Sequence, residues 1–485
     1  MNWKQILRLT GTMQLIVGIF MLIPTVMALV LREWLAFKGF AFSLIIIVIY
    51  LSIILTIGRS WSSQTLNVRD VYLFVTLTWV IASAFGAIPI YVSGLDHTFA
   101  SAYMEVMSGF TTTGLTTLSF LDSDPLSILF WRSLTHWIGG MGIVVLFVAL
   151  LPLIGSEGAQ LFGAETTGPV KSRLTPKIKN TALILWLIYV GITLLEIIAL
   201  LLGNLSLFDA ITISFGTVAT GGFSPHDASI AYYNNAYVEV VVTICMMMGG
   251  INFSLYFSLL KGKFSTVLKN TELKVYLLII IIASLIATIS LKASGSYSSF
   301  SDSLRHGTFH IVSSITTTGF SAAHYEGWPY LAQSMIFILM FVGGSSGSTG
   351  GGIKVSRIIT MFRLGRQNIK TMLHPKGFFT IQSEKEQISW TAVNAIVGFI
   401  ALYVALILGG MVVISSAGFD LYSSFTAALT SIGNVGLGFG AFGSQGVGFG
   451  ALPGYAQWTL SFLMLAGRLE LYTVLALFTR TFWRR

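Results

Sequence analysis

A four-residue phrase built around a glycine occurs four times in the chain and could bind a cation. The copies span Thr112–Leu115, Thr220–Phe223, Thr317–Phe320 and Asn434–Leu437. Glycine lets backbone carbonyls turn toward a common axis, and four such turns could form a ring of oxygens that replaces the water shell of a cation. The candidate ring residues are Thr112, Thr113, Gly114, Thr220, Gly221, Gly222, Thr317, Thr318, Gly319, Asn434, Val435 and Gly436.

The composition requires a membrane setting for these phrases. The chain of 485 residues is 54% hydrophobic and only 10% charged, whereas soluble domains carry roughly a quarter charged residues. Its net charge of +9 comes from basic residues placed between apolar runs, which is the pattern of cytoplasmic loops and does not indicate nucleic-acid binding. The single Cys245 excludes an intramolecular disulfide framework.

Apolar runs long enough to span a bilayer place the phrases in a repeated unit. Two spans without a phrase come first, at about Leu7–Leu31 and Ala41–Ile57. A unit then recurs four times: a long apolar helix, a helix too short to span, the phrase and a second long helix. The second long helices are expected at about Ser127–Ile154, Tyr237–Leu260, Trp328–Thr360 and Ala456–Phe478.

The sequence therefore predicts an all-α integral membrane protein with ten spans. Two N-terminal transmembrane helices precede four membrane–pore-helix–membrane repeats around a central pore. The short helices must enter and leave the bilayer on one side, because non-helical backbone at membrane depth needs protein or water around it. The expected divisions are residues 1–69 for the N-terminal pair and 70–179, 180–270, 271–388 and 389–485 for the repeats.

The charges predict which side of the bilayer each loop occupies. With both termini in the cytoplasm, 21 of the 28 Lys and Arg residues fall in cytoplasmic stretches. The opposite face carries acidic residues that could concentrate cations or oppose the dipoles of the short helices. These are Asp96, Asp122, Asp124, Asp209, Asp227, Asp302, Glu326 and Asp420.

A glycine- and serine-rich stretch, Gly343–Gly352, interrupts the apolar run of the third repeat. Because Trp328–Val342 is too short to span alone, this stretch must lie at membrane depth and line a cavity. Arg468 is expected near the middle of its helix, where a charge must face protein or water. It could form an electrostatic barrier in the pore or pair with Glu470. Lys354 could close the stretch in a similar way.

Several of these features resemble the TrkH family within the TrkH/KtrB/HKT superfamily of potassium transporters. The resemblance rests on the four glycine phrases, on His136–Gly142, on Gly343–Lys354 and on Gly467–Glu470. The two extra N-terminal spans resemble the bacterial TrkH branch. The family resemblance implies a gate formed by Gly343, Gly344, Ser345, Ser346, Gly347, Ser348, Thr349, Gly350, Gly351, Gly352, Lys354 and Arg468.

The resemblance also implies a function and a setting. The expected function is potassium uptake through the bacterial cytoplasmic (inner) membrane, driven by the membrane potential, with K⁺ as the transported ion and no organic cofactor. Serine at the first filter glycine goes with sodium transport in the superfamily, so Gly114 implies a preference for potassium. The implied partners are a second copy in a homodimer, the lipid bilayer and a cytosolic TrkA-type RCK ring that binds nucleotides.

Other residues and functions stay open at this stage. Glu105 could hydrogen-bond the backbone near the first phrase or pair with Arg132, and His306 with His310 lacks a third metal ligand. A symporter that couples potassium to protons or sodium is one alternative function. The potassium-conducting subunit of a P-type ATPase is another. An enzyme is not expected, because no nucleophile–base or metal set clusters and no phosphate-binding loop is present.

Overall fold

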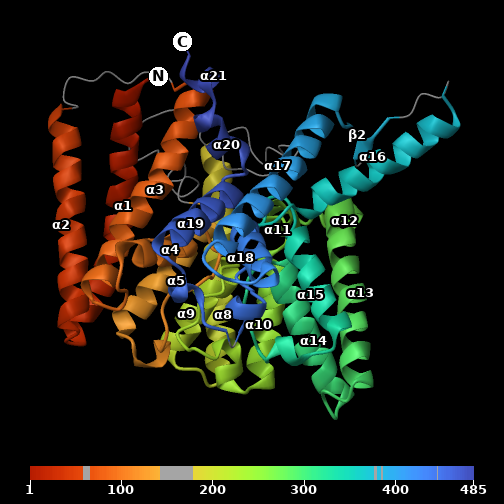
Figure 1. Ribbon diagram of the computed structural model, residues 1–485, viewed down its shortest axis with the longest axis horizontal. Helices are drawn as coiled ribbons and strands as arrows, with labels where there is room; N and C mark the ends of the chain where they lie inside the picture. Colours follow the sequence, from red (N-terminus) through yellow and green to blue (C-terminus); the bar gives the residue numbers. More distant parts are fainter. Residues whose placement is uncertain (58–65, 143–177, 376–379, 384–385, 445, 485) are drawn as a thin grey trace.

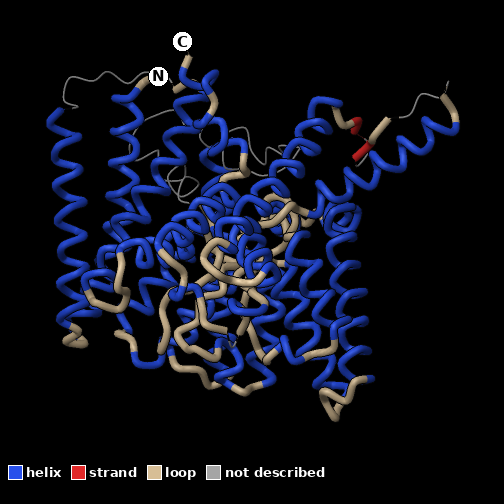
Figure 2. Tube along the Cα trace, viewed as in Figure 1, coloured by secondary structure: helices blue, strands red, loops and turns tan. Residues whose placement is uncertain are grey.

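The computed structural model describes residues 1–57, 66–142, 178–375, 380–383, 386–444 and 446–484. Most of these residues lie in helices that run side by side, and both termini lie at the same end of the molecule (Figure 1). Loops gather at the centre and at the end opposite the termini (Figure 2). Apart from one short pair of strands, the described part is therefore the helical membrane protein that the composition predicts.

The two N-terminal helices form a layer at one side of the molecule. Helices α1 (Trp3–Val30) and α2 (Trp34–Ile57) pack against each other and against α3 (Val68–Val92). A polar contact crosses this layer, because the Gln14 amide donates to the Thr78 carbonyl over 3.2 Å. The exposed face of α2 is apolar, with Val48 58% exposed, as expected for a helix that faces lipid.

Three sets of helices build the rest of the molecule. The first long helices are α3, α8 (Ile178–Leu202), α13 (Thr271–Ala293) and α17 (Trp390–Ser415). The short helices are α4 (Phe99–Phe110), α9 (Leu207–Val218), α14 (Phe300–Ile315) and α18 (Leu421–Gly433). The second helices begin with α5 (Leu126–Gly140), α10 (Ala236–Gly249), α15 (Tyr330–Val342) and α19 (Gly454–Arg468).

These helices close into a circle. Each first long helix packs on the short helix that follows it in the chain. Each second helix packs on the short helix of the next unit: α5 on α9, α10 on α14, α15 on α18 and, closing the circle, α19 on α4. The short helices are therefore held at the centre of the molecule (Figure 1).

Smaller elements complete the chain. The remaining α-helices are α11 (Phe253–Leu260), α12 (Phe264–Lys269), α16 (Val355–Leu373), α20 (Tyr472–Leu475) and α21 (Arg480–Trp483). Short 3₁₀ turns lie at Leu121–Ser123, Ser229–Tyr233, Tyr325–Gly327, Gly440–Phe442, Phe449–Ala451 and Ala476–Phe478. One small antiparallel pair of strands joins β1 (Gln382–Ser383) to β2 (Glu386–Gln387).

The second long helices depart from the expectation of continuous spans. Among the described residues, six helices are long and apolar enough to cross a membrane. The run Tyr237–Leu260 instead bends by 94° between α10 and α11, and Ala456–Phe478 bends by 114° after α19. Part of the expected helix Ser127–Ile154 lies outside the described residues, and its described part, α5, ends at Gly140.

Two of the second helices approach the ends of short helices closely, which hydropathy does not show. A Cβ atom on Gly467 would lie 1.9 Å from the carbonyl oxygen of Ile432, at the end of α18. A Cβ atom on Gly139 would lie 1.8 Å from the carbonyl oxygen of Phe110, at the end of α4. These second helices thus approach the short helices closely at glycine. An apolar run in the sequence indicates the length of a helix but not such a contact.

A glycine in α2 tests the packing of the N-terminal layer. A Cβ atom on Gly39 would lie 2.8 Å from Cα of Pro89, which is backbone and cannot rotate away. We expect Gly39→Ala to lower stability by about 1–3 kcal/mol, measured as the midpoint of thermal unfolding in detergent. Gly191→Ala is the matched control, because Gly191 is also helical and has no atom within 4 Å of its Cβ position. An equal midpoint for both variants would contradict close packing at Gly39.

Candidate functional site

The four short helices end in the same way. In each, the first residue of the phrase donates its N–H to the carbonyl three residues earlier, and the second donates to the carbonyl five residues earlier. The first residues all take left-handed backbone angles, with φ of 51° at Thr112, 52° at Thr220, 58° at Thr317 and 51° at Asn434. This is the Schellman arrangement of a helix C-terminus, repeated four times.

The glycines of the four phrases meet each other in a closed ring. Each lies against the carbonyl oxygen of the second phrase residue in the next unit. The distances from a built Cβ atom are 2.2 Å from Gly114 to Gly221 O, 1.9 Å from Gly222 to Thr318 O, 2.5 Å from Gly319 to Val435 O and 2.6 Å from Gly436 to Thr113 O. With φ near 85° as well, only glycine fits these positions. The structure thus brings all twelve predicted ring residues together.

The first residue of the phrase differs between the units. A β-branched residue with positive φ is strained by about 1–3 kcal/mol, so Thr112, Thr220 and Thr317 must be held by their surroundings. Asn434 tolerates this geometry better, and its side chain has a further use. It donates to Thr113 Oγ1 over 2.9 Å and to the Met464 carbonyl over 3.0 Å. This contact closes the ring between the fourth and first units.

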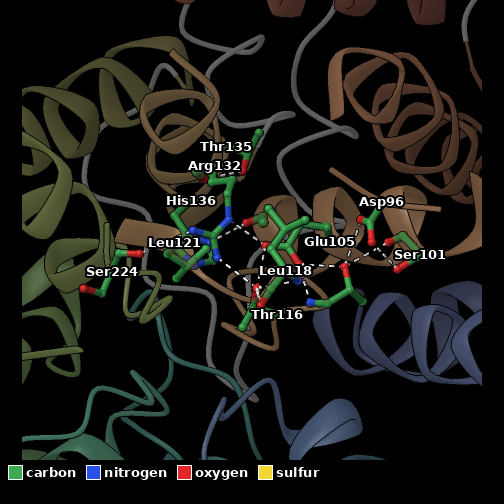
Figure 3. A network of polar contacts seen from close by, with 12 residues as sticks. Asp96, Ser101, Glu105, Thr116, Leu118, Leu121, Arg132, Thr135, His136 and Ser224 are labelled. Carbon is green, nitrogen blue, oxygen red and sulfur yellow. Dashed lines mark hydrogen bonds and ion pairs between the residues drawn. The ribbon is translucent and has the colours of Figure 1, made fainter. Parts of the chain in front are cut away.

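A buried ion pair supports the first unit. The Glu105 carboxylate accepts the Thr117 N–H over 2.6 Å and the Thr116 hydroxyl over 3.0 Å. It also pairs with Arg132 Nε over 2.6 Å, and both side chains are almost fully buried. Arg132 in turn donates to the Ser224 carbonyl over 3.3 Å, beyond the ring glycine of the second unit (Figure 3). Both roles considered for Glu105 are therefore present.

One face of α5 supports the ring from outside. Arg132 lies 4.2 Å from the centroid of the Phe223 ring, and His136, one turn later, stacks on the same ring at 4.1 Å. His136 also contacts the Gly109 carbonyl through Nδ1 over 2.7 Å. No role was predicted for His136 or Phe223, although the spacing of Arg132 and His136 places them on one helical face.

The 343–352 loop lies directly against the ring. It connects α15 to α16, and most of its residues are buried. The Gly351 N–H donates to Thr317 Oγ1 over 2.7 Å, and Thr220 Oγ1 donates to Thr349 Oγ1 over 3.2 Å. A Cβ atom on Gly351 would lie 2.3 Å from the Gly433 carbonyl oxygen. The loop thus contacts the ends of the second, third and fourth short helices.

Arg468 links this loop to the first unit. It donates to the Thr349 carbonyl over 2.7 Å and to the Gly139 and Gly140 carbonyls over 2.7 and 3.0 Å. The expectation that it lies near the middle of a helix is wrong, since Arg468 is the last residue of α19. The bend after α19 places it beside the loop.

The other charges near the loop have their own partners. Glu470 pairs with Arg357, so the alternative pairing of Glu470 with Arg468 is not observed. The guanidinium of Arg357 also lies 4.0 Å from the centroid of the Phe399 ring. Lys354 is buried and donates to the Gly350 carbonyl within the loop.

The end opposite the termini carries acidic side chains between the units. Burial raises the pKa of Asp96 to about 6, against the hydrogen bond from Ser101. It also raises the pKa of Asp124 to about 6, against the charge of Arg132. Both carboxyls therefore still ionise at neutral pH. His226 contacts Asp122 over 2.5 Å and Asp209 over 3.5 Å, which joins the first unit to the second.

The two histidines of α14 contact a backbone carbonyl and a carboxylate. His310 contacts the His306 carbonyl over 2.9 Å, and His306 lies 3.4 Å from the Glu239 carboxylate. Among the described residues, no group of three or more His, Cys, Asp or Glu side chains could hold a metal ion. The candidate site is therefore the ring of backbone oxygens, with the 343–352 loop beside it.

The fold and the ring define a class of membrane protein that handles cations, and comparison with known proteins identifies the family. Residues 40–484 match the TrkH family model, described as "Cation transport protein". The chain therefore belongs to the TrkH family, as the sequence motifs suggested, and it has a transport function rather than an enzymatic one.

Named relatives and a solved structure resemble the whole chain. It is 36% identical to the Trk system potassium uptake protein TrkH of Escherichia coli K12, over 100% of both chains. It is 33% identical to TrkG of the same organism, over 99% of both. The crystal structure of the potassium transporter TrkH from Vibrio parahaemolyticus aligns over 100% of both chains, with a TM-score of 0.88 and 32% identity.

The ion pair behind the first phrase yields a stability prediction. Arg132→Met leaves Glu105 buried without its cation, and we expect a loss of about 3–5 kcal/mol with a fall in the yield of folded protein. The double variant Glu105→Gln/Arg132→Met should recover part of the loss, because the amide oxygen still accepts the Thr117 N–H. Thermal unfolding in detergent measures both, with the exposed Arg8→Met as control. A single variant as stable as the double variant would refute this account.

Proposed function

We propose that the chain takes up potassium across the bacterial cytoplasmic membrane through a channel-like pore, driven by the membrane potential. The closed ring of glycines and carbonyl oxygens is the single observation that carries the proposal. Such oxygens can replace the water around a potassium ion. The C-terminal ends of the four short helices add partial negative charge near the ring. The names of the relatives support potassium as the ion.

In this proposal the phrases form the selectivity filter and the 343–352 loop with Lys354 and Arg468 forms the gate. The loop contacts the ends of three short helices, and Arg468 contacts both the loop and the end of α5. An ion that leaves the ring would therefore meet the loop and Arg468. Loop movement would have to break the bond from Arg468 to Thr349. The acidic face is then the outer mouth, and both termini are cytoplasmic.

The proposal includes regulation from outside this chain. A cytosolic TrkA-type RCK ring that binds nucleotides would act on the cytoplasmic face, and two copies of the chain would form a homodimer. The family resemblance supports both partners. The basic residues of α16, which extends away from the circle of helices (Figure 1), offer a contact surface for an acidic partner. The repeat divisions at residues 69, 179, 270 and 388 belong to the same proposal.

Replacing one ring glycine tests the filter. Gly114→Ser places a Cβ atom against the Gly221 carbonyl oxygen, so the ring must distort and lose its fit to potassium. We expect the potassium-to-sodium uptake ratio in liposomes to fall by about tenfold, or ~1.4 kcal/mol of discrimination.

The control for this test has the same backbone strain without the ring contact. Gly94 also has positive φ, at 76° against 82° for Gly114, but no atom lies within 4 Å of its Cβ position. Gly94→Ser should therefore keep the parent ratio. An unchanged ratio in Gly114→Ser would exclude Gly114 from ion selection.

Removing the arginine beside the ring tests the gate. Arg468→Ala eliminates one hydrogen bond from α19 to the loop and two from α19 to the end of α5. It also removes a positive charge from the proposed ion path. We expect potassium flux into liposomes to rise about tenfold, equal to ~1.4 kcal/mol. Arg484→Ala, at the exposed C-terminal end, should leave flux unchanged. Flux at the parent level in Arg468→Ala would argue against the barrier.

A further inference from the structure

The 343–352 loop is bonded mainly to a part of the chain that precedes it by many residues. Ser345 N–H donates to the Gly250 carbonyl over 2.9 Å, and Thr349 N–H donates to the Gly249 carbonyl over 3.3 Å. The Phe253 N–H donates to the Gly347 carbonyl over 3.0 Å. All three partners lie at the 94° bend between α10 and α11. The loop is therefore attached to the second unit, although its sequence belongs to the third.

A carboxylate at the start of α13 completes this attachment. Glu272 Oε1 accepts the Ser346 N–H over 2.7 Å and the Ser356 N–H over 3.1 Å. Ser346 lies in the loop, while Ser356 lies in the first turn of α16, where backbone N–H groups lack helical partners. A carboxylate suits that place, since it also opposes the positive end of the helix dipole.

Glu272 and Arg468 hold the loop at different points. Arg468 binds the Thr349 carbonyl on the side of the ring. Glu272 binds the Ser346 N–H and the first turn of α16. Between Phe253 and Glu272 the chain forms α11, α12 and the start of α13, which we call the elbow. Both ends of the elbow are hydrogen-bonded to the loop or its continuation.

We propose that Glu272 is a positioning residue that keeps the loop against the ring and makes it move together with the elbow. This inference rests on the proposed gating role of the loop and adds the element that controls it. A displacement of α11 and α12 would pull on the loop at Gly347 and Ser346. The elbow, rather than α15, is then the route by which a signal reaches the loop.

Flux measurements on the full chain in liposomes, without any regulatory partner, test the proposal. Glu272→Ala removes both hydrogen bonds, and potassium flux should rise about tenfold, equal to ~1.4 kcal/mol. The potassium-to-sodium ratio should stay at the parent value, since the ring is untouched. Glu272→Gln keeps an acceptor oxygen without the charge and should give a smaller rise. Lys274→Gln changes a charge on the same turn and should leave flux unchanged.

Combining two variants separates this proposal from the gate itself. Because Glu272 and Arg468 hold one loop, flux in Glu272→Ala/Arg468→Ala should be smaller than the product of the two single effects. Parent flux in Glu272→Ala with raised flux in Arg468→Ala would overturn the role of Glu272 and leave the gate standing. Parent flux in both would overturn the gate together with this inference. A changed ion ratio in Glu272→Ala, or strict multiplication of the two effects, would also contradict it.

Discussion

Backbone polar groups inside a bilayer must find partners within the protein, and the whole centre of this molecule follows from that requirement. Four short helices end at membrane depth, and each end leaves carbonyls without helical partners. The Schellman bonds satisfy part of them, from Thr113 to Ser108 and from Val435 to Thr430 among others. The second phrase carbonyls instead meet the glycines of the neighbouring unit. In the proposed function, a potassium ion is the further partner of these carbonyl oxygens.

The need of backbone polar groups for partners also explains why charged side chains lie close to the 343–352 loop. The 343–352 loop has its own backbone groups to satisfy, and Arg468 and Lys354 supply donors to the Thr349 and Gly350 carbonyls. Glu272 supplies an acceptor for two N–H groups of the same region. Buried charges are costly in hydrocarbon. Here each charged side chain forms a hydrogen bond with a backbone group of the loop region. The residues that support the loop are therefore the same ones to which we assign its control in the proposed function.

The sequence predicted the local features of this arrangement and missed those that depend on distant contacts. Hydropathy located the long helices, and the glycine phrases located the four helix ends, because both signals lie within a few residues. It placed Arg468 in the middle of a helix, since an apolar run does not reveal the bend that follows Gly467. The contact from Asn434 to Thr113 joins residues 321 positions apart, and no local pattern reports such a pair.

That long-range contact has a consequence for how the protein matures. The fourth short helix packs against the first through α19, and Asn434 completes the last junction. During synthesis the first three units emerge with the ring still open between the first and third. Until the C-terminal unit inserts, the Thr113 hydroxyl lacks its bond from Asn434 and has only its contact with the Thr111 hydroxyl within the first unit. The C-terminal unit, which is synthesised last, is therefore the one that closes the circle of helices.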